Sequence, residues 1–304
     1  MRSLQLPGYW AFTGQVLSVL RDSRKQVLLL GLLYVLVSGV FLGLGSQESF
    51  TTLRETLSEA GAYITDGDWS AMGEASLLAL STVAGSLSPS LTEAQQVYAI
   101  ILGLLMWLAL VWLLRQKRAG GSVRVRDALY NAGAPIIPTT LLFVVLLLQL
   151  LPIALVAIGY SAAQATGLLA GGVEAMLFWA AATGLAALSL YWLSSTALAL
   201  VIVTLPGMYP MRALRIAGDM VVGRRLRILY RVLWMLLGVV VMWAAVLIPI
   251  IMLDTGLKDI WPVIAWLPTI PVVVLVLSCL SFIWVASYVY LLYRGIVDDD
   301  AKPA

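Results

Sequence analysis

The sequence has no histidine and only one cysteine. Without histidine, Ser-His-Asp and Cys-His catalytic sites are excluded, and so are zinc or haem sites that use imidazole. With one cysteine, no disulfide can form within the chain. Cys279 lies in an apolar run, so we expect it to pack as a small hydrophobic side chain. We predict no metal site and no cofactor.

Charge is also scarce. Only 12% of the 304 residues are charged and 61% are hydrophobic, whereas a soluble domain is about 25% charged. Several apolar runs reach the roughly 20 residues that a helix needs to cross a bilayer. A β-barrel would instead show short segments of alternating hydrophobicity. The composition therefore predicts an all-α polytopic membrane protein.

Acidic residues are almost absent from the apolar runs. Glu174 lies at the outer end of one run, and Asp254 follows the outer end of another. A transporter coupled to protons or cations normally needs such a group within the membrane, so its absence counts against that class. Catalytic sequence motifs and paired carboxylates at membrane depth are missing too. We therefore predict that the protein is not an enzyme.

The apolar runs predict six transmembrane helices within a single transmembrane domain of residues 1–304. The predicted spans are residues 26–45, 97–114, 136–160, 174–203, 228–252 and 263–293. Of the 19 basic residues, only Arg54 and Lys258 fall in the loops between spans one and two or five and six. Lysine and arginine are retained on the cytoplasmic side, so we expect both termini there.

The segments outside the spans differ in charge. Residues 1–25 predict a cytoplasmic amphipathic segment, and residues 294–304 a cytoplasmic tail. The loop 46–96 is acidic, and its apolar spacing predicts short amphipathic helices on the outer surface. Thr92, near the end of this loop, is expected to cap the start of the second span.

The connection 205–227 is the one substantial polar segment in the second half of the chain. It predicts an amphipathic helix on the cytoplasmic membrane surface, bent into the fifth span. Pro210 suits the first turn of that helix, and Gly223 suits its end. Six arginines lie in this connection or just after it: Arg212, Arg215, Arg224, Arg225, Arg227 and Arg231.

Guanidinium groups match the geometry of phosphate, and juxtamembrane clusters of them attract anionic lipid. The hypothesis is that these six arginines contact anionic lipid of the cytoplasmic leaflet or an acidic protein partner. Arg224, Arg227 and Arg231 are spaced to share one helix face. The alternative, which stays open, is that the cluster only sets topology and contacts lipid without specificity.

Two stretches of the sequence resemble each other. Leu-Pro-Gly opens both, at Leu6 and Leu205, and a weaker copy, SVRVRDALYNAGAPIIP, precedes span three. We expect one apolar face of Phe12, Val16, Val19 and Leu20, and another of Met211, Leu214, Gly218, Val221 and Val222. The pattern predicts three helical hairpins, each preceded by an amphipathic cytoplasmic helix that we call an elbow helix. Chance similarity of short basic segments is the alternative.

Polar and helix-breaking residues within the spans are few. Gln149, Pro249, Pro268 and Pro271 form a candidate intramembrane polar or kink site. Pro268 and Pro271 would unwind the start of span six and free carbonyl groups for a ligand. Interhelical hydrogen bonding by Gln149 and kinks fitted by packing are the alternatives. Gly39 and Gly43 have the GxxxG spacing of closely packed helices.

Residues 200–233 resemble a pattern in a loose group of bacterial inner-membrane proteins. That group includes the YciC-like proteins and the membrane domain that accompanies glycerophosphoryl diester phosphodiesterases. The matching residues are Ala213, Leu214, Arg215, Val221, Val222, Gly223, Arg224 and Arg225. Ala217-Gly218 departs from the pattern, which favours a serine there. The resemblance implies a six-span protein of the bacterial inner membrane, but no phosphodiesterase activity, because the catalytic domain is absent.

Taken together, these features favour a non-enzymatic inner-membrane protein that acts as a scaffold or accessory subunit. Its expected partners are anionic lipids and either a second protein or further copies of this chain, but not nucleic acid. The alternative is a transporter or lipid-handling protein with a path between the helical repeats, near Gln149, Pro249 and Pro268. An intramembrane enzyme has the least support.

Overall fold

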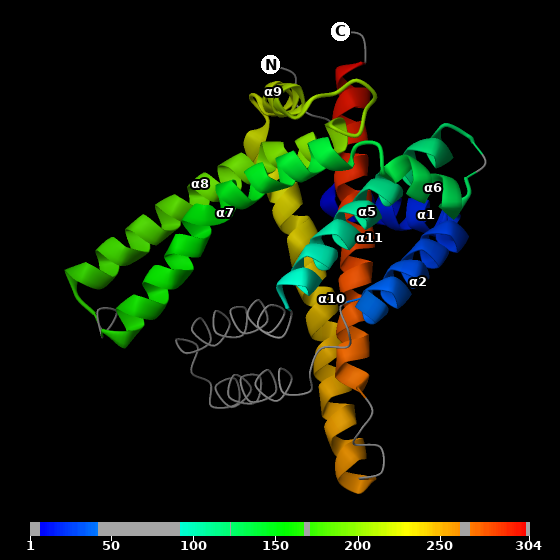
Figure 1. The fold of residues 1–304 in the computed structure, drawn as a ribbon. Coiled ribbons are helices and arrows are strands. Elements are labelled where there is room, and N and C mark those ends of the chain that lie inside the picture. The colour runs from blue at the N-terminus through cyan, green and yellow to red at the C-terminus, as the bar shows by residue number, and fades with distance from the viewer. Residues whose placement is uncertain (1–6, 42–91, 122, 167–170, 262–267, 302–304) are drawn as a thin grey trace. The chain divides into compact units, whose positions relative to one another are not determined.

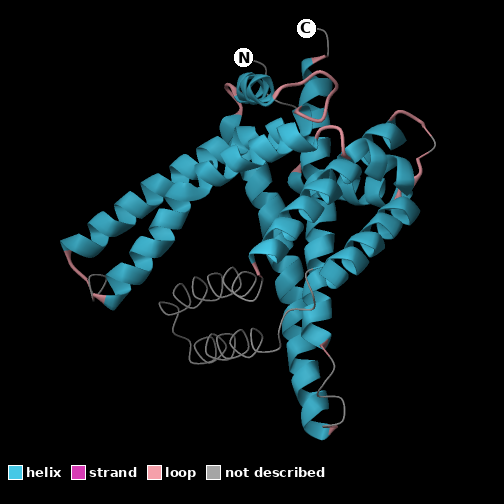
Figure 2. Cartoon of the chain, in the orientation of Figure 1, coloured by secondary structure: helices cyan, strands magenta, loops and turns pink. Residues whose placement is uncertain are grey.

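The structure is a computed structural model of the chain that describes residues 7–41, 92–121, 123–166, 171–261 and 268–301. All regular secondary structure in these ranges is α-helical (Figures 1 and 2). The helices are α1 (Tyr9–Asp22), α2 (Arg24–Phe41), α5 (Glu93–Arg118), α6 (Val125–Ala132), α7 (Ile136–Ala165), α8 (Val173–Ile202), α9 (Pro210–Val221), α10 (Arg225–Ile260) and α11 (Thr269–Asp300).

Six of the described helices are long and apolar enough to cross a membrane. Their candidate spans are Arg24–Phe41, Glu93–Arg118, Ile136–Tyr160, Val173–Ile202, Arg225–Asp254 and Thr269–Asp300. Each overlaps one of the six predicted spans, so that part of the prediction is confirmed. The chain therefore has the architecture of a multi-pass membrane protein.

Capping residues explain several helix ends. The backbone N–H of Thr92 donates to Gln95 Oε1 at 2.9 Å, and the N–H of Gln95 donates back to Thr92 Oγ1 at 3.4 Å. This reciprocal pair satisfies backbone donors that the first turn of α5 would leave unpaired, so the predicted cap is confirmed. Pro210 is the first residue of α9, and Gly223, with φ of 74°, separates α9 from α10.

The chain divides into two compact units. The first comprises residues 1–26, 107–237 and 285–304, and the second comprises residues 27–106 and 238–284. Helices α2, α5, α10 and α11 contribute residues to both units. The predicted acidic loop 46–96 lies almost entirely outside the described residues, and so does Gly43.

In the second unit, α10 and α11 share an apolar core. Leu247, Val274 and Leu277 are buried there, with Trp243 packed against them. Trp243 Nε1 donates a hydrogen bond to Ser281 Oγ at 2.8 Å, so the indole is satisfied within the apolar layer.

Helix α2 packs closely against α11 at Gly31. A Cβ atom added there would lie 3.2 Å from Cys279 Sγ, whereas one added at Gly39 would meet only Leu275, at 3.8 Å. The close approach of α2 is thus at Gly31, about two turns before Gly39, the first residue of the predicted GxxxG pair. Cys279 is buried, as the sequence predicted.

In the first unit, α8 packs against both α7 and α9. Short helices α1, α6 and α9 directly precede the long helices α2, α7 and α10. Each buries residues one turn apart: Phe12 and Val16 in α1, Ala128 and Ala132 in α6, and Ala213, Ala217 and Val221 in α9. The three-hairpin repeat and the position of these helices on a membrane surface stay predictions.

Candidate functional site: the basic face and its pocket

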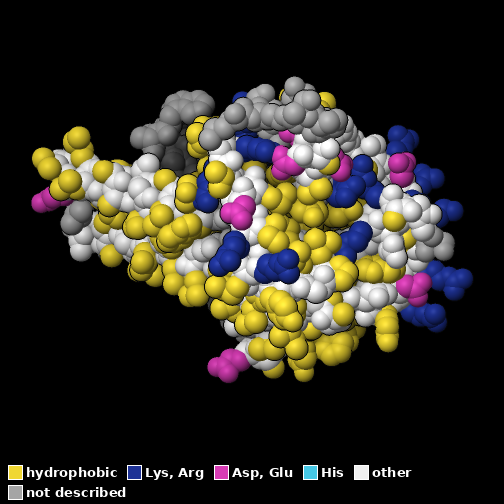
Figure 3. Space-filling view, turned by 90° about the horizontal axis from the view of Figure 1, so that it is seen from above, with side chains coloured by type: hydrophobic (Ala, Val, Ile, Leu, Met, Phe, Trp, Pro, Cys, Tyr) yellow, Lys and Arg dark blue, Asp and Glu magenta, His cyan; other side chains and the backbone are white. Residues whose placement is uncertain are grey.

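Basic side chains gather in the first unit. Among the described residues, every lysine and arginine except Lys258 belongs to it. Lys258 lies in the second unit, where its Nζ pairs with Asp254 at 2.8 Å. Figure 3 looks onto the end that carries α9, where Lys and Arg side chains lie among apolar ones. We call this surface of the first unit the basic face.

Helix α9 presents two different sides. Ala213, Ala217 and Val221 are buried, because small side chains let the helix approach α8 closely. Arg212 and Arg215 lie on the exposed side, and neither forms an ion pair with another described residue. The positively charged side of α9 is therefore accessible.

The predicted apolar face of α9 needs correction. Met211 and Val222 were expected to share it, but their exposed fractions are 77% and 62%. Sequence pattern favours the largest hydrophobic residues, whereas contact with α8 selects the small ones. The exposed side chains of Met211 and Val222 are therefore accessible to membrane lipid. In α1, by contrast, Phe12 and Val16 are buried as predicted.

Arg224 and Arg225 contact other parts of the first unit. Arg224 forms an ion pair with Asp300, the last residue of α11. The guanidinium of Arg225 lies 3.9 Å from the ring centroid of Tyr191 in α8. Cation–π contact of this kind is stabilising, more so where water is excluded. Both arginines therefore join the start of α10 to neighbouring helices.

Arg231 is buried, with an exposed fraction of 7%. It donates a hydrogen bond to the backbone carbonyl of Pro7, and its guanidinium lies 5.0 Å from the ring of Phe12 and 5.3 Å from that of Tyr9. Nearby, Trp234 Nε1 donates to Thr13 Oγ1 at 3.1 Å. These contacts fasten α1 to the first turns of α10.

The six arginines therefore do not form one exposed cluster. Arg212, Arg215 and Arg227 have exposed side chains, Arg224 and Arg225 are half-buried, and Arg231 is internal. The expected shared face of Arg224, Arg227 and Arg231 includes two residues that bind other segments of the chain. The hypothesis of lipid contact consequently narrows to the exposed arginines, above all to Arg212 and Arg215.

The predicted intramembrane site is divided between the units. Gln149 lies in the first unit, where its Oε1 accepts a hydrogen bond of 2.6 Å from Thr196 Oγ1 and so links α7 to α8. This is the interhelical role that the sequence left as the alternative. Pro249, Pro268 and Pro271 lie in the second unit.

None of the three prolines interrupts a described helix. Pro249 is exposed within the continuous helix α10. Pro271 lies in the first turn of α11, where a missing amide donor costs little. The carbonyl of Pro268 accepts a hydrogen bond from the Val272 N–H at 3.2 Å. The predicted unwinding at the start of span six is therefore not seen among the described residues.

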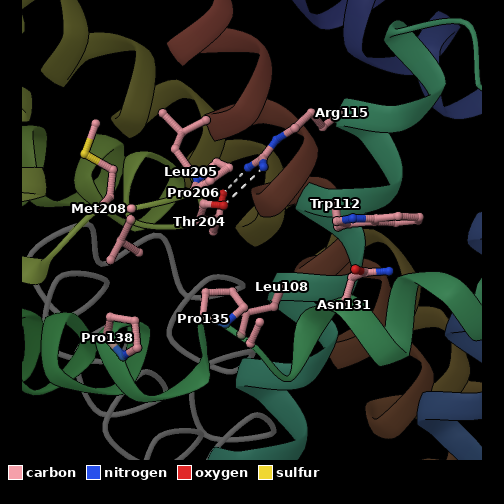
Figure 4. Close-up of a pocket in the computed structure, with 13 residues that line it drawn as sticks. Leu108, Trp112, Arg115, Asn131, Pro135, Pro138, Thr204, Leu205, Pro206 and Met208 are labelled. Carbon is pink, nitrogen blue, oxygen red and sulfur yellow. Dashed lines mark hydrogen bonds between the residues drawn. The ribbon is translucent and has the colours of Figure 1, made fainter.

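A pocket of about 340 Å³ opens on the first unit. Three segments line it: the end of α5, the turn between α6 and α7, and the turn after α8. Figure 4 shows it, with Arg115, Trp112 and Asn131 as its main polar side chains. Its apolar lining includes Leu108, Pro135, Pro138, Val203, Leu205 and Met208. We call it the Arg115 pocket.

Arg115 is held in one orientation. Its Nη1 donates to the backbone carbonyl of Thr204 at 3.1 Å, and its Nη2 donates to Thr204 Oγ1. Thr204 Oγ1 in turn donates to the Val201 carbonyl at 2.7 Å. No carboxylate of the described residues forms an ion pair with Arg115, although its side chain is half-buried.

Sequence reasoning counted Arg115 only among the charges that set topology. Its position gives a further signal, because it follows Trp112 by one turn and precedes the exposed Lys117 and Arg118 at the end of an apolar run. An arginine inside that end is expected to need a polar partner. The turn at Thr204, 89 residues later in the chain, could not be paired with it from spacing alone.

The fold defines the class: a multi-pass, all-helical membrane protein, in which the first unit carries all described basic residues except Lys258. No family model, curated protein or solved structure matches the chain. The resemblance of residues 200–233 to the YciC-like group therefore stays a prediction.

Proposed function

We propose that this chain is a non-enzymatic scaffold or accessory subunit that docks anionic lipid through the exposed side of α9. The observation that carries the proposal is that one side of α9 is buried against the protein and the other side is exposed. Ala213 and Ala217 hold it to the protein, while Arg212, Arg215 and the exposed Met211 face outward. Helices that lie in the membrane interface combine basic and apolar residues in this way.

The location follows from the same proposal. The membrane is the bacterial inner membrane, and the basic face with both termini lies on the cytoplasmic side, where basic residues are retained. Anionic lipids of that leaflet are then the natural counterions. A protein partner or further copies of the chain would bind the lipid-anchored scaffold.

Support for the alternative, a transporter or lipid-handling protein with a path near Gln149, Pro249 and Pro268, is weaker. Gln149 is engaged by Thr196, and the Pro268 carbonyl by Val272. Each group thus already has one hydrogen-bond partner within the protein.

The test is lipid selectivity of the purified protein, measured as phosphatidylglycerol retained relative to phosphatidylcholine by native mass spectrometry. Each juxtamembrane charge contributes roughly 1 kcal/mol at low salt, so the Arg212→Gln/Arg215→Gln variant should lower the selectivity roughly tenfold or more. The difference should shrink as ionic strength rises.

The matched control is Arg124→Gln/Arg126→Gln, which removes the same charge from exposed positions at the start of α6. It should change selectivity much less. Equal losses in both variants would mean that net charge alone attracts lipid, and unchanged selectivity in the α9 variant would remove the proposal.

A further inference from the structure

The Arg115 pocket has the features of a binding site rather than of a packing defect. Its volume of about 340 Å³ lies within the range of roughly 300–1,000 Å³ found for small-molecule sites. Its lining combines a mainly apolar wall with a few polar groups, as such sites do. It is formed wholly by residues 108–208, within the first unit.

Charge identifies the ligand as an anion. Arg115 has five N–H donors, and its two hydrogen bonds to Thr204 fix the guanidinium beside the pocket (Figure 4). A half-buried cation with no carboxylate partner among the described residues favours an external anion. Guanidinium prefers phosphate and carboxylate, which it binds through two parallel hydrogen bonds.

The position of the pocket at the ends of candidate spans favours an anion that is part of a lipid. Arg115 lies in the last turn of α5, Pro135 just before α7, and Val203 just after α8. Three candidate spans thus end or begin at the pocket, which corresponds to the headgroup level of a bilayer. Trp112 suits the same level, because indole rings prefer the membrane interface.

We propose that the Arg115 pocket binds the headgroup phosphate of one anionic phospholipid. Arg115 contacts the phosphate, the Asn131 amide and the Trp112 N–H contact the polar headgroup, and the acyl chains leave along the apolar wall that includes Leu108 and Pro138. The proposal deepens the proposed function, since it adds a specific internal lipid site to the exposed docking surface of α9.

The experiment uses the full-length protein after extensive delipidation, with native mass spectrometry as the readout. Dihexanoyl phosphatidylglycerol, dihexanoyl phosphatidylcholine and inorganic phosphate are added in separate titrations. One phosphatidylglycerol per chain should bind and survive raised salt, with about tenfold or greater preference over phosphatidylcholine, because a charge-assisted pair is formed. Equal binding of phosphatidylcholine, or equal binding of inorganic phosphate, would overturn the proposal.

Two variants test the site itself. Arg115→Gln removes the cation and should weaken the retained lipid about tenfold or more. Ala134→Phe leaves Arg115 and Thr204 unchanged but fills the pocket from the exposed position 134, and should also abolish the retained lipid. The Ala134→Phe variant keeps the test valid if Arg115→Gln unfolds because the Arg115–Thr204 contact is lost. Retention of the lipid by folded Ala134→Phe protein would refute the proposal that the lipid binds in the Arg115 pocket.

The experiments distinguish failure of the pocket proposal from failure of the proposed lipid docking through α9. Arg212→Gln/Arg215→Gln should remove the salt-sensitive lipids and keep the single salt-resistant one. If the pocket variants lose only the salt-resistant lipid and the α9 variant loses only the salt-sensitive lipids, both proposals stand. If the pocket variants change nothing while the α9 variant lowers selectivity, only the internal site is wrong.

Discussion

At the scale of single residues, burial separates arginines that look alike in the sequence. Arg212 is exposed on α9, whereas Arg231 is internal and hydrogen-bonded to the Pro7 carbonyl. Burying a guanidinium is costly unless it is hydrogen-bonded or lies over aromatic rings. Arg231 meets both conditions, which gives it a role in holding α1.

The substitution Arg231→Gln should release α1. Glutamine is too short to reach Pro7 and forms no cation–π contact with Phe12, so we expect a stability loss of about 1–3 kcal/mol. Thermal unfolding in detergent measures the loss, and limited proteolysis near α1 reports its release. Arg212→Gln is the control at an exposed position, and it should neither lower the melting temperature nor increase proteolysis near α1. An unchanged melting temperature and proteolysis pattern would contradict the assigned role.

At the scale of helices, the ranges and ends of the helices were predictable from the sequence, while the contacts between helices were not. Apolar run length gave all six spans, and Thr92, Pro210 and Gly223 gave helix ends, because both depend on local chemistry. Which side of α9 packs depends on the shape of α8, a tertiary property. The bond between Arg115 and Thr204 joins segments whose proximity only the fold creates, so this pocket was not predicted.

Helix α2 allows a direct test of close packing with one substitution at two sites. Gly31→Ala would bring Cβ to 3.2 Å from Cys279 Sγ and 3.4 Å from Ile283 Cδ1, whereas Gly39→Ala meets only Leu275 at 3.8 Å. Alanine favours a helix over glycine by about 0.5–1 kcal/mol at both sites, so that gain cancels in the comparison. Overpacking should make Gly31→Ala less stable than Gly39→Ala by about 1 kcal/mol or more.

Melting temperatures in the same detergent measure this difference. Equal stability of the two variants would show that α2 can move away from α11 without cost, and that Gly31 is not a packing constraint.

At the scale of the whole molecule, every described lysine and arginine except Lys258 lies in one of the two units. We predict that successive candidate spans cross the membrane in opposite directions, with their basic ends on one side. Composition and the length of the apolar runs were sufficient to predict six candidate spans, since lipid solvation constrains a chain more strongly than water does. The orientation of these spans stays a prediction.

Single-cysteine labelling tests the orientation. In a Cys279→Ala background, Lys117→Cys should react with a membrane-impermeant maleimide only after the membrane is opened, because it follows the second span at the basic end. Glu174→Cys, exposed at the start of α8, should react in intact spheroplasts. Labelling of both from the same side would refute the six-span orientation and the lipid proposals that depend on it.

The contact between Arg231 and Pro7 joins residues 224 positions apart, which bears on how the chain is made. Because synthesis proceeds from the N-terminus, α1 leaves the ribosome long before Arg231 exists. Helix α1 therefore cannot make this contact until the start of α10 has been synthesised. Final closure of the first unit is then a late event in biogenesis, and truncations that end before residue 231 should leave α1 unattached.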